Sequence, residues 1–200
     1  MQLNAEDGGN RKFIMVQLPE LTDEKSEAYK AGYKTIADIG RERIRRAGEK
    51  ILEDNKDKVG IDNLDIGFRA FKIDEGFHKD VYRKASELTQ MDIMDLESNI
   101  REDRDALDLL FATLLGWGVA IDKEYKSFDI DGYRVYDYDD GAIIACFEDN
   151  IPEDVIRKIA KIDSEYVVFR DSSFGSSSEK INAIEIFKTI SSNPDKVRVI

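Results

Sequence analysis

Residues 126–147 read KSFDIDGYRVYDYDDGAIIACF, and this stretch decides the fold that the sequence predicts. Two Asp-Gly pairs, at residues 131–132 and 140–141, separate three short runs rich in aromatic and β-branched side chains. Asp-Gly is a preferred hairpin turn because both positions tolerate a positive φ angle. The stretch therefore predicts a three-stranded antiparallel meander over residues 126–130, 133–138 and 142–147.

Helical and strand-like segments alternate after the meander. Pro152 suits the first turn of a helix, which we expect to end near residue 162. Further segments are expected in the order strand, helix, strand, over residues 166–169, 177–190 and 197–200. This β-β-β-α-β-α-β order predicts a small α/β domain over residues 119–200.

An acidic and mostly helical connector is predicted over residues 74–118. Residues 79–97 have a helical pattern in pieces, with a break expected at residues 89–92. Asn99 and Glu102 have the spacing of a capping box, and the helix that they open is expected to end near Gly116. Its apolar face is widened by Phe111 and Trp117, which indicates a helix in a core.

The amino-terminal part predicts strand followed by helix, which is the order of an α/β layer. Residues 13–18, FIMVQL, follow a turn signal and precede Pro19, so we expect a buried strand. Residues 35–55 predict an amphipathic helix with weak points at Gly40 and Gly48. Residues 65–73 alternate as in a half-buried strand.

The acidic excess is confined to two stretches. The 200 residues carry 42 acidic and 30 basic side chains, a formal charge of −12, which argues against an autonomous nucleic-acid binder. Residues 74–108 and 122–149 carry −6 each, so the remainder is neutral. Within that remainder, residues 41–50 carry a local charge of +3. This basic stretch could contact a phosphate. The interpretation that we favour is a solvated helix face with i,i+4 ion pairs.

Several kinds of site are excluded or disfavoured by residue type. With a single cysteine and a single histidine, the chain cannot form an intrachain disulfide, and no metal site is expected. A hydrolase triad of Ser, His and Asp would need His78 as its base, because His78 is the single histidine. Cys146 lies within a predicted strand. No catalytic residue is therefore expected. The acidic turns lack the spacing of a calcium loop. The absence of a secretory signal or a long apolar run predicts a cytoplasmic protein with no membrane partner.

Two segments leave alternatives open. Residues 171–178, DSSFGSSS, could present amides and hydroxyls to a phosphate, but serine before a helix is more often its N-cap. Glu20, two residues beyond the predicted strand, occupies the place of an acid that accepts hydrogen bonds from ribose hydroxyls in nucleoside-binding folds. An acid after a strand is common, however. The pair Gly8-Gly9 precedes the strand and is interpreted as a turn.

An ordered set of motifs extends over essentially the whole chain. It begins with DGGNRKFIMVQLPE at residues 7–20 and AGYKTIAD at residues 31–38, and continues with ERIRRA at 42–47 and DIGFR at 65–69. Later members lie at residues 104–119, 142–147, 167–172, 180–182 and 197–200. The set resembles the carboxy-terminal part of the modification (Mod) subunit of type III restriction-modification systems.

This resemblance implies an S-adenosylmethionine-dependent, adenine-specific DNA methyltransferase. Residues 1–73 would be a remnant of its Rossmann-like core. In such enzymes a catalytic Asp-Pro-Pro-Tyr segment and a glycine-containing cofactor motif precede the strand that ends in Pro-Glu. This chain contains neither motif. We therefore expect a fragment that begins just after the cofactor loop and is inactive alone, which leaves its status as an enzyme open.

The resemblance also implies roles for particular residues and partners. Glu20 matches the acid that binds the ribose of S-adenosylmethionine, and Gln17 and Leu18 would line the same cleft. DNA would be bound through the missing amino-terminal part, where the target adenine must be flipped out of the duplex. Because residues 119–200 are too acidic to bind DNA nonspecifically, we expect them to serve assembly with a second Mod subunit or with the restriction subunit. The alternative is a free-standing interaction or regulatory module without a cofactor.

Overall fold

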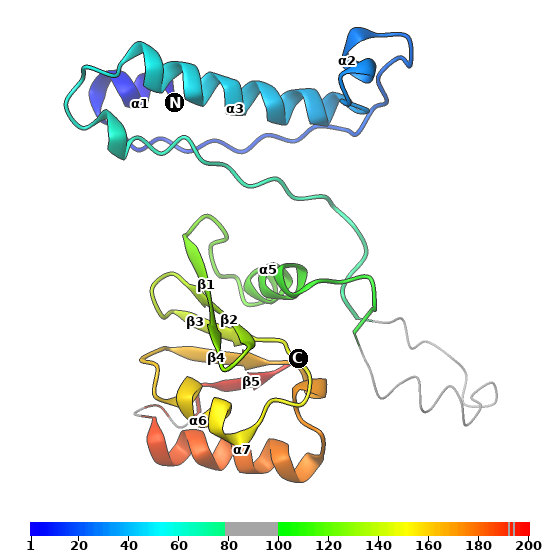
Figure 1. Ribbon diagram of the computed structural model, residues 1–200, viewed down its shortest axis with the longest axis vertical. Helices are drawn as coiled ribbons and strands as arrows, with labels where there is room; N and C mark the ends of the chain where they lie inside the picture. Colours follow the sequence, from blue (N-terminus) through cyan, green and yellow to red (C-terminus); the bar gives the residue numbers. More distant parts are fainter. Residues whose placement is uncertain (79–99, 192, 194) are drawn as a thin grey trace. The chain divides into compact units, whose positions relative to one another are not determined.

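The protein forms two compact units, residues 1–73 and residues 74–200 (Figure 1). The computed structural model describes residues 1–78, 100–191, 193 and 195–200. The helical pieces predicted over residues 79–97, with their break at residues 89–92, lie outside the described residues.

The second unit is built on a five-stranded mixed sheet. Its strands are β1 (Tyr125–Ile130), β2 (Tyr133–Tyr138), β3 (Ile143–Cys146), β4 (Tyr166–Phe169) and β5 (Val197–Val199), adjacent in that same order. The first two pairs are antiparallel and the last two are parallel. The predicted meander and both later strands are confirmed.

The two turns of the meander have the backbone conformation that Asp-Gly pairs favour. Asp131 and Gly132 have φ angles of 51° and 88° in the first turn, and Asp140 and Gly141 have φ angles of 47° and 94° in the second. Gly141 is required for a further reason, because a Cβ atom there would lie 2.8 Å from the carbonyl oxygen of Asp163.

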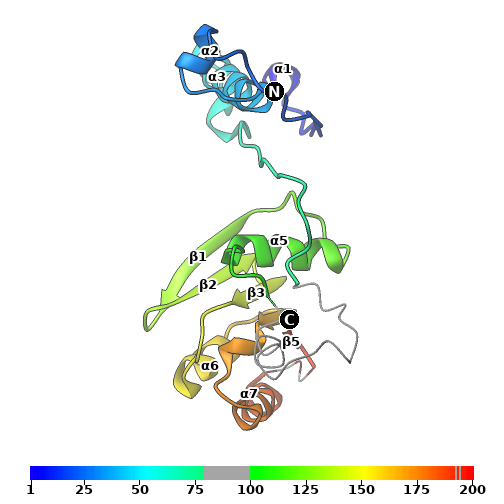
Figure 2. The same ribbon diagram turned by 90° about the vertical axis from the view of Figure 1, so that its right-hand side faces the viewer.

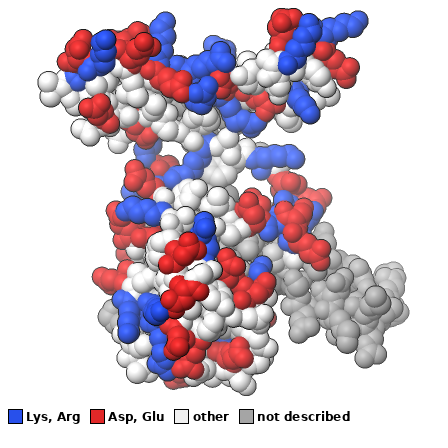
Figure 3. All heavy atoms as spheres, viewed as in Figure 1, with Lys and Arg blue, Asp and Glu red and all other residues white. Residues whose placement is uncertain are grey.

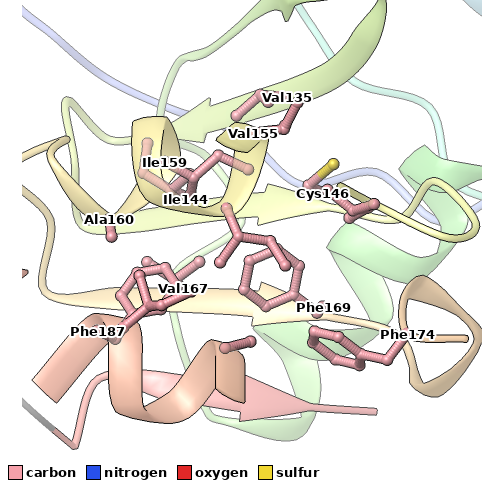
Figure 4. Close-up of a cluster of buried hydrophobic side chains, with 14 residues drawn as sticks. Val135, Ile144, Cys146, Val155, Ile159, Ala160, Val167, Phe169, Phe174 and Phe187 are labelled. Carbon is pink, nitrogen blue, oxygen red and sulfur yellow. The ribbon is translucent and has the colours of Figure 1, made fainter. Parts of the chain in front are cut away.

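Helices cover both faces of the sheet (Figure 2). On one face, α6 (Glu153–Ala160) and α7 (Ser177–Ile190) pack together, and the chain enters α7 through the short helix η3 (Asp171–Ser173). Figure 4 shows the core of this face, where Phe169 of β4 contacts the rings of Phe174 and Phe187. On the other face, α5 (Ala106–Gly116) buries three leucines against the sheet, Leu109, Leu110 and Leu114.

The predicted start of α5 is wrong. The helix begins at Ala106, because the Asp105 carboxylate accepts a hydrogen bond from the Asp108 N–H at 2.8 Å and the Asp108 carboxylate accepts one in return. Glu102 lies in a turn before the helix, and Asn99 lies outside the described residues. Trp117 is the C-cap and is 39% exposed, so it does not widen the core as predicted.

The first unit consists of helices and extended segments. Its helices are α1 (Gln2–Asp7), α2 (Glu27–Lys30), α3 (Ile36–Asp54) and η1 (Ile61–Asn63). The predicted helix over residues 35–55 is confirmed as α3. Thr35 caps it and forms a reciprocal capping box with Asp38, which satisfies two backbone donors at its start.

The two strands predicted in this unit are wrong. Residues 13–18 and 65–73 are extended but form no strand, and Ile14 and Val16 are 95% and 86% exposed. A strand needs a neighbour to pair its backbone groups. The isolated bridge described in residues 1–73 joins Leu21 and Thr35, so neither predicted segment becomes part of a sheet.

The predicted α/β class is thus confirmed. The sheet is found in the second unit, and helix α5 of the predicted connector packs on that sheet. The division into residues 1–73, 74–118 and 119–200 stays a proposal.

Candidate functional site

The residues suggested for cofactor binding lie in one extended segment of the first unit. Gln17, Leu18 and Glu20 are exposed, and the Gln17 side-chain amide donates a hydrogen bond to the Leu18 carbonyl at 3.1 Å. The structure therefore brings the three side chains together on a single stretch of chain, without an enclosing cleft around them in the described unit.

This segment is held at both ends. At its start, Asn4 exchanges two hydrogen bonds with the backbone of Arg11, at 3.0 and 3.1 Å. At its end, the Ile36 N–H donates to the Glu20 carbonyl at 2.9 Å, which fixes Glu20 beside the first turn of α3. The middle of the segment, residues 13–18, is exposed along its whole length.

The chemistry of Glu20 fits hydroxyl recognition. Its side chain is exposed, and in the described part of the chain no Lys or Arg forms an ion pair with it. An unpaired carboxylate can accept two hydrogen bonds, as adjacent ribose hydroxyls require. The pair Gly8-Gly9 contributes no cofactor turn, because Gly8, with a φ angle of 71°, ends α1.

The basic stretch of α3 is compensated on its own helix. Arg45 contacts the two carboxylate oxygens of Glu42 at 2.9 and 2.7 Å and also pairs with Glu49. Arg46 pairs with the same Glu42, and Arg41 pairs with Asp38. Figure 3 shows Lys and Arg interleaved with Asp and Glu on the visible face of this unit. The interpretation as a salt-bridged helix face is confirmed.

Hydrogen bonds from the two arginines change the acidity of Glu42. Arg45, followed by Arg46, lowers the pKa of Glu42 from 4.5 to about 2. Both arginines stabilise the ionised carboxylate, so Glu42 stays charged well below the usual range.

A shallow depression lies beside the start of α3. It has a volume of about 270 Å³ and is lined by two aromatic residues, two ion pairs and a glycine, namely Tyr33, Phe68, Asp38, Arg41, Glu42, Arg45 and Gly32. The sequence suggested Arg41 and Arg45 through their charge. It did not indicate Tyr33 and Phe68 as neighbours of these arginines, because only folding brings the four residues together. The depression does not include Gln17, Leu18 or Glu20.

The serine-rich segment before α7 caps that helix. The Ser176 hydroxyl accepts a hydrogen bond from the Glu179 N–H at 3.3 Å, and the Glu179 carboxylate accepts one from the Gly175 N–H at 2.8 Å. Because the chain's own carboxylate binds the exposed amide there, the capping interpretation is confirmed.

Cys146 and His78 lie in separate surroundings. Cys146 is buried in β3, and burial raises the pKa of its thiol to about 11, so the thiol is protonated at neutral pH. His78 forms an isolated bridge with Ile100 and stacks against Phe77. Among the residues that the structure describes, no group of His, Cys, Asp or Glu could hold a metal ion.

No helix in the described ranges combines the length and the apolar character that a membrane span requires.

The fold and these contacts define a class of protein. It is a mixed α/β protein whose sheet unit has its own core, joined to a helical unit with an exposed apolar segment that ends in an available carboxylate. The chain resembles the Mod subunits of type III restriction-modification enzymes, as its motifs indicated.

Three curated relatives support that resemblance, and no family model matches the chain. A Mod subunit from Escherichia coli is 27% identical over 200 residues, which cover 97% of this chain and 28% of the relative. One from Salmonella typhimurium is 42% identical over 72 residues, which cover 36% of this chain and 10% of the relative. One from Escherichia phage P1 is 36% identical over 61 residues, or 30% of this chain and 9% of the relative. The chain thus spans less than a third of the length of the relatives that it matches.

Proposed function

We propose that this chain is the carboxy-terminal part of an adenine-specific DNA methyltransferase of the type III modification class. The similarity to a Mod subunit over 97% of the chain carries the proposal. In the intact enzyme a methyl group passes from S-adenosylmethionine to the flipped adenine. The chain alone is inactive in this proposal, since it lacks the Asp-Pro-Pro-Tyr and glycine motifs.

In the proposed enzyme, residues 1–73 complete a Rossmann-like core. The exposed run at residues 13–18 supports this role, because its apolar side chains and unpaired backbone suit a strand of a larger sheet. Glu20 would then accept hydrogen bonds from the ribose hydroxyls of S-adenosylmethionine, and Gln17 and Leu18 would line the same cleft.

Residues 119–200 serve assembly with a second Mod subunit or with the restriction subunit in this proposal, and DNA is bound by the amino-terminal part. The formal charge supports this division. Residues 119–200 carry 17 acidic and 11 basic side chains, a formal charge of −6, whereas residues 1–73 carry 14 of each. A unit of that charge repels the DNA backbone. The system would act in the cytoplasm, where its DNA substrate is found.

Calorimetry with S-adenosylmethionine tests the cofactor role of Glu20. Saturable binding to the full chain that Glu20→Ala weakens by at least roughly 10-fold, since two hydrogen bonds to a charged group are lost, would support a cofactor site retained in this chain. Glu24→Ala is the matched control, because Glu24 is also exposed and belongs to the same unit, and it should leave binding unchanged.

A second candidate function is a free-standing interaction or regulatory module without a cofactor. The separate core of residues 74–200 favours it, because this unit has a complete sheet with helices on both faces. Absence of S-adenosylmethionine binding to the full chain would contradict a cofactor site retained in this chain and favour this second function.

A further inference from the structure

Three exposed side chains contact one another on the surface of the second unit. The ring centroids of Trp117 and Tyr166 are 5.8 Å apart, and the Arg198 guanidinium lies 5.5 Å from the centroid of Tyr166. Trp117 and Tyr166 are 39% and 40% exposed, and Arg198 is exposed as well. We call these three residues the aromatic patch.

The aromatic patch lies on the face of the sheet that α5 covers. Trp117 is the C-cap of α5, and Tyr166 alternates along β4 with Val168, which packs under α5. Arg198 lies between Val197 and Val199, which both pack on the opposite face. A helix is about 10 Å wide and strands are about 4.8 Å apart, so one helix covers about two strands. Two described helices cover the opposite face, but α5 is the single described helix on this one.

Three acidic residues lie close in the chain to residues of the aromatic patch. Asp163 and Glu165 lie three residues and one residue before Tyr166, Asp195 lies three residues before Arg198, and all three are exposed. None of them lies within ion-pair distance of a described lysine or arginine, but the charge of Asp163 acts on Lys196 and that of Asp195 acts on Lys188. Glu165 is the acid of this group without such a described lysine or arginine, and we call the three residues the acidic rim.

Arg198 is held in place by the backbone. Its guanidinium donates hydrogen bonds to the carbonyl oxygens of Asp195 at 2.6 Å and Val197 at 2.9 Å. These contacts fix its position over the Tyr166 ring. Arg198 has therefore already lost side-chain conformational entropy before any partner binds.

We propose that the aromatic patch is a docking surface for a segment of a partner protein that has an apolar centre flanked by lysine or arginine. Trp, Tyr and Arg are the residues most enriched at the energetic centres of interfaces, and the acidic rim complements a basic flank. A second copy of the chain is a poorer occupant, because two copies that each carry a formal charge of −12 repel one another. This inference rests on the assembly role proposed above and names its surface.

The fluorescence of Trp117 provides the test, because it is the single tryptophan of the chain. The full chain is titrated with three capped peptides: Lys-Arg-Leu-Phe-Leu-Arg-Lys, its acid-flanked form Glu-Asp-Leu-Phe-Leu-Asp-Glu, and the apolar-free form Lys-Arg-Ser-Gly-Ser-Arg-Lys. We expect a saturable blue shift of the emission with the first peptide alone. Tyr166→Ala should weaken that binding by at least roughly 10-fold.

Two further variants keep the test independent of folding. Phe128→Ala is the matched control, because Phe128 is 37% exposed on β1, outside the aromatic patch, and it should not change the affinity. Glu165→Gln alters an exposed side chain, so it should preserve the fold while it weakens binding and reduces its dependence on salt.

Three results would overturn the proposal. The first is the absence of a shift with the apolar-centred basic peptide. The second is an equal shift with the acid-flanked or apolar-free peptide, which would mean that the acidic rim or the apolar centre is not recognised. The third is a shift that depends on the concentration of the chain without peptide, which would identify a second copy as the occupant. None of these results bears on S-adenosylmethionine binding by the first unit, which the calorimetry tests separately.

Discussion

Glu42 is the most strongly paired acid of the amino-terminal unit. One carboxylate receives hydrogen bonds from two arginines on its own helix, Arg45 at i+3 and Arg46 at i+4. The positive charge of the arginines in α3 is therefore partly neutralised by ion pairs within the same helix. Glu20, a residue of the same charge, has no such partner among the described residues and remains available to a ligand.

The lowered pKa of Glu42 predicts a pH dependence of the stability of α3. In the unfolded chain the carboxylate binds its proton near 4.5, but in the folded helix it does so at about 2. The stabilisation is therefore fully present above pH 4.5 and is lost as the pH falls towards 2. Titration of the side-chain carboxyl by NMR should give a pKa of about 2.

Glu42→Gln is the matching variant. It should remove this part of the acid dependence of helix content, measured by circular dichroism, whereas Glu53→Gln on the same helix should leave it unchanged. A titration of Glu42 at the ordinary glutamate value would mean that the arginine contacts do not persist in solution.

At the scale of the element, α3 contains two glycines that the structure distinguishes. A Cβ atom at Gly40 would meet no atom within 4 Å, but at the buried Gly48 it would lie 2.9 Å from the Cβ of Ile66. Gly48 therefore allows the extended segment after η1 to approach the helix closely. The sequence had marked both glycines equally, as weak points of the helix.

This difference predicts opposite effects of the same substitution. Gly40→Ala should stabilise the unit by about 0.5–1 kcal/mol, because alanine loses less backbone freedom in a helix. Gly48→Ala should destabilise it by about 1–3 kcal/mol, because the added methyl group displaces Ile66. Urea unfolding followed by circular dichroism measures both, and stabilisation by both substitutions would show that the Ile66 contact is absent.

At the scale of the whole molecule, the two units differ in how their apolar residues are buried. Both described apolar clusters lie in residues 74–200, on the two faces of the sheet. In residues 1–73, Ile14, Val16 and Leu18 are exposed in one continuous run. An exposed run of this kind marks a surface for another chain or for more of the same chain.

Hydrogen exchange should separate the two units. The amides of residues 13–18 are exposed and unpaired, so we expect them to exchange nearly as fast as in an unfolded peptide. The amides of β3 and β4, which lie in the centre of the sheet, should exchange far more slowly. Exchange followed by mass spectrometry on the full chain measures both regions. Strong protection of residues 13–18 would mean that this segment is already paired with another chain.

The sheet unit was predictable because its signals are local. Asp-Gly turns fix the antiparallel pairs of β1 to β3, and alternating strand and helix patterns define the remainder within about fifty residues. The start of α5 was missed because two capping boxes compete in neighbouring sequence. The one formed by Asp105 and Asp108 prevails because these residues adjoin the leucines that the sheet buries.

The candidate site was only partly predictable. The sequence and its family resemblance singled out Glu20 and the basic face of α3. The sequence could not show that Arg45 and Arg46 share one carboxylate, because this contact depends on the positions of the side chains. It also could not show that Trp117, Tyr166 and Arg198 are in contact, because they belong to elements far apart in the chain.

The sequence by itself determined the α/β class, the meander, the capped helices and the resemblance to Mod subunits, since each of these depends on residue types at short spacing. Only the tertiary structure decided which apolar segments are strands. Residues 13–18 have the composition of a buried strand, but a strand exists only where a neighbouring backbone offers its hydrogen bonds, and residues 1–73 offer none to this segment.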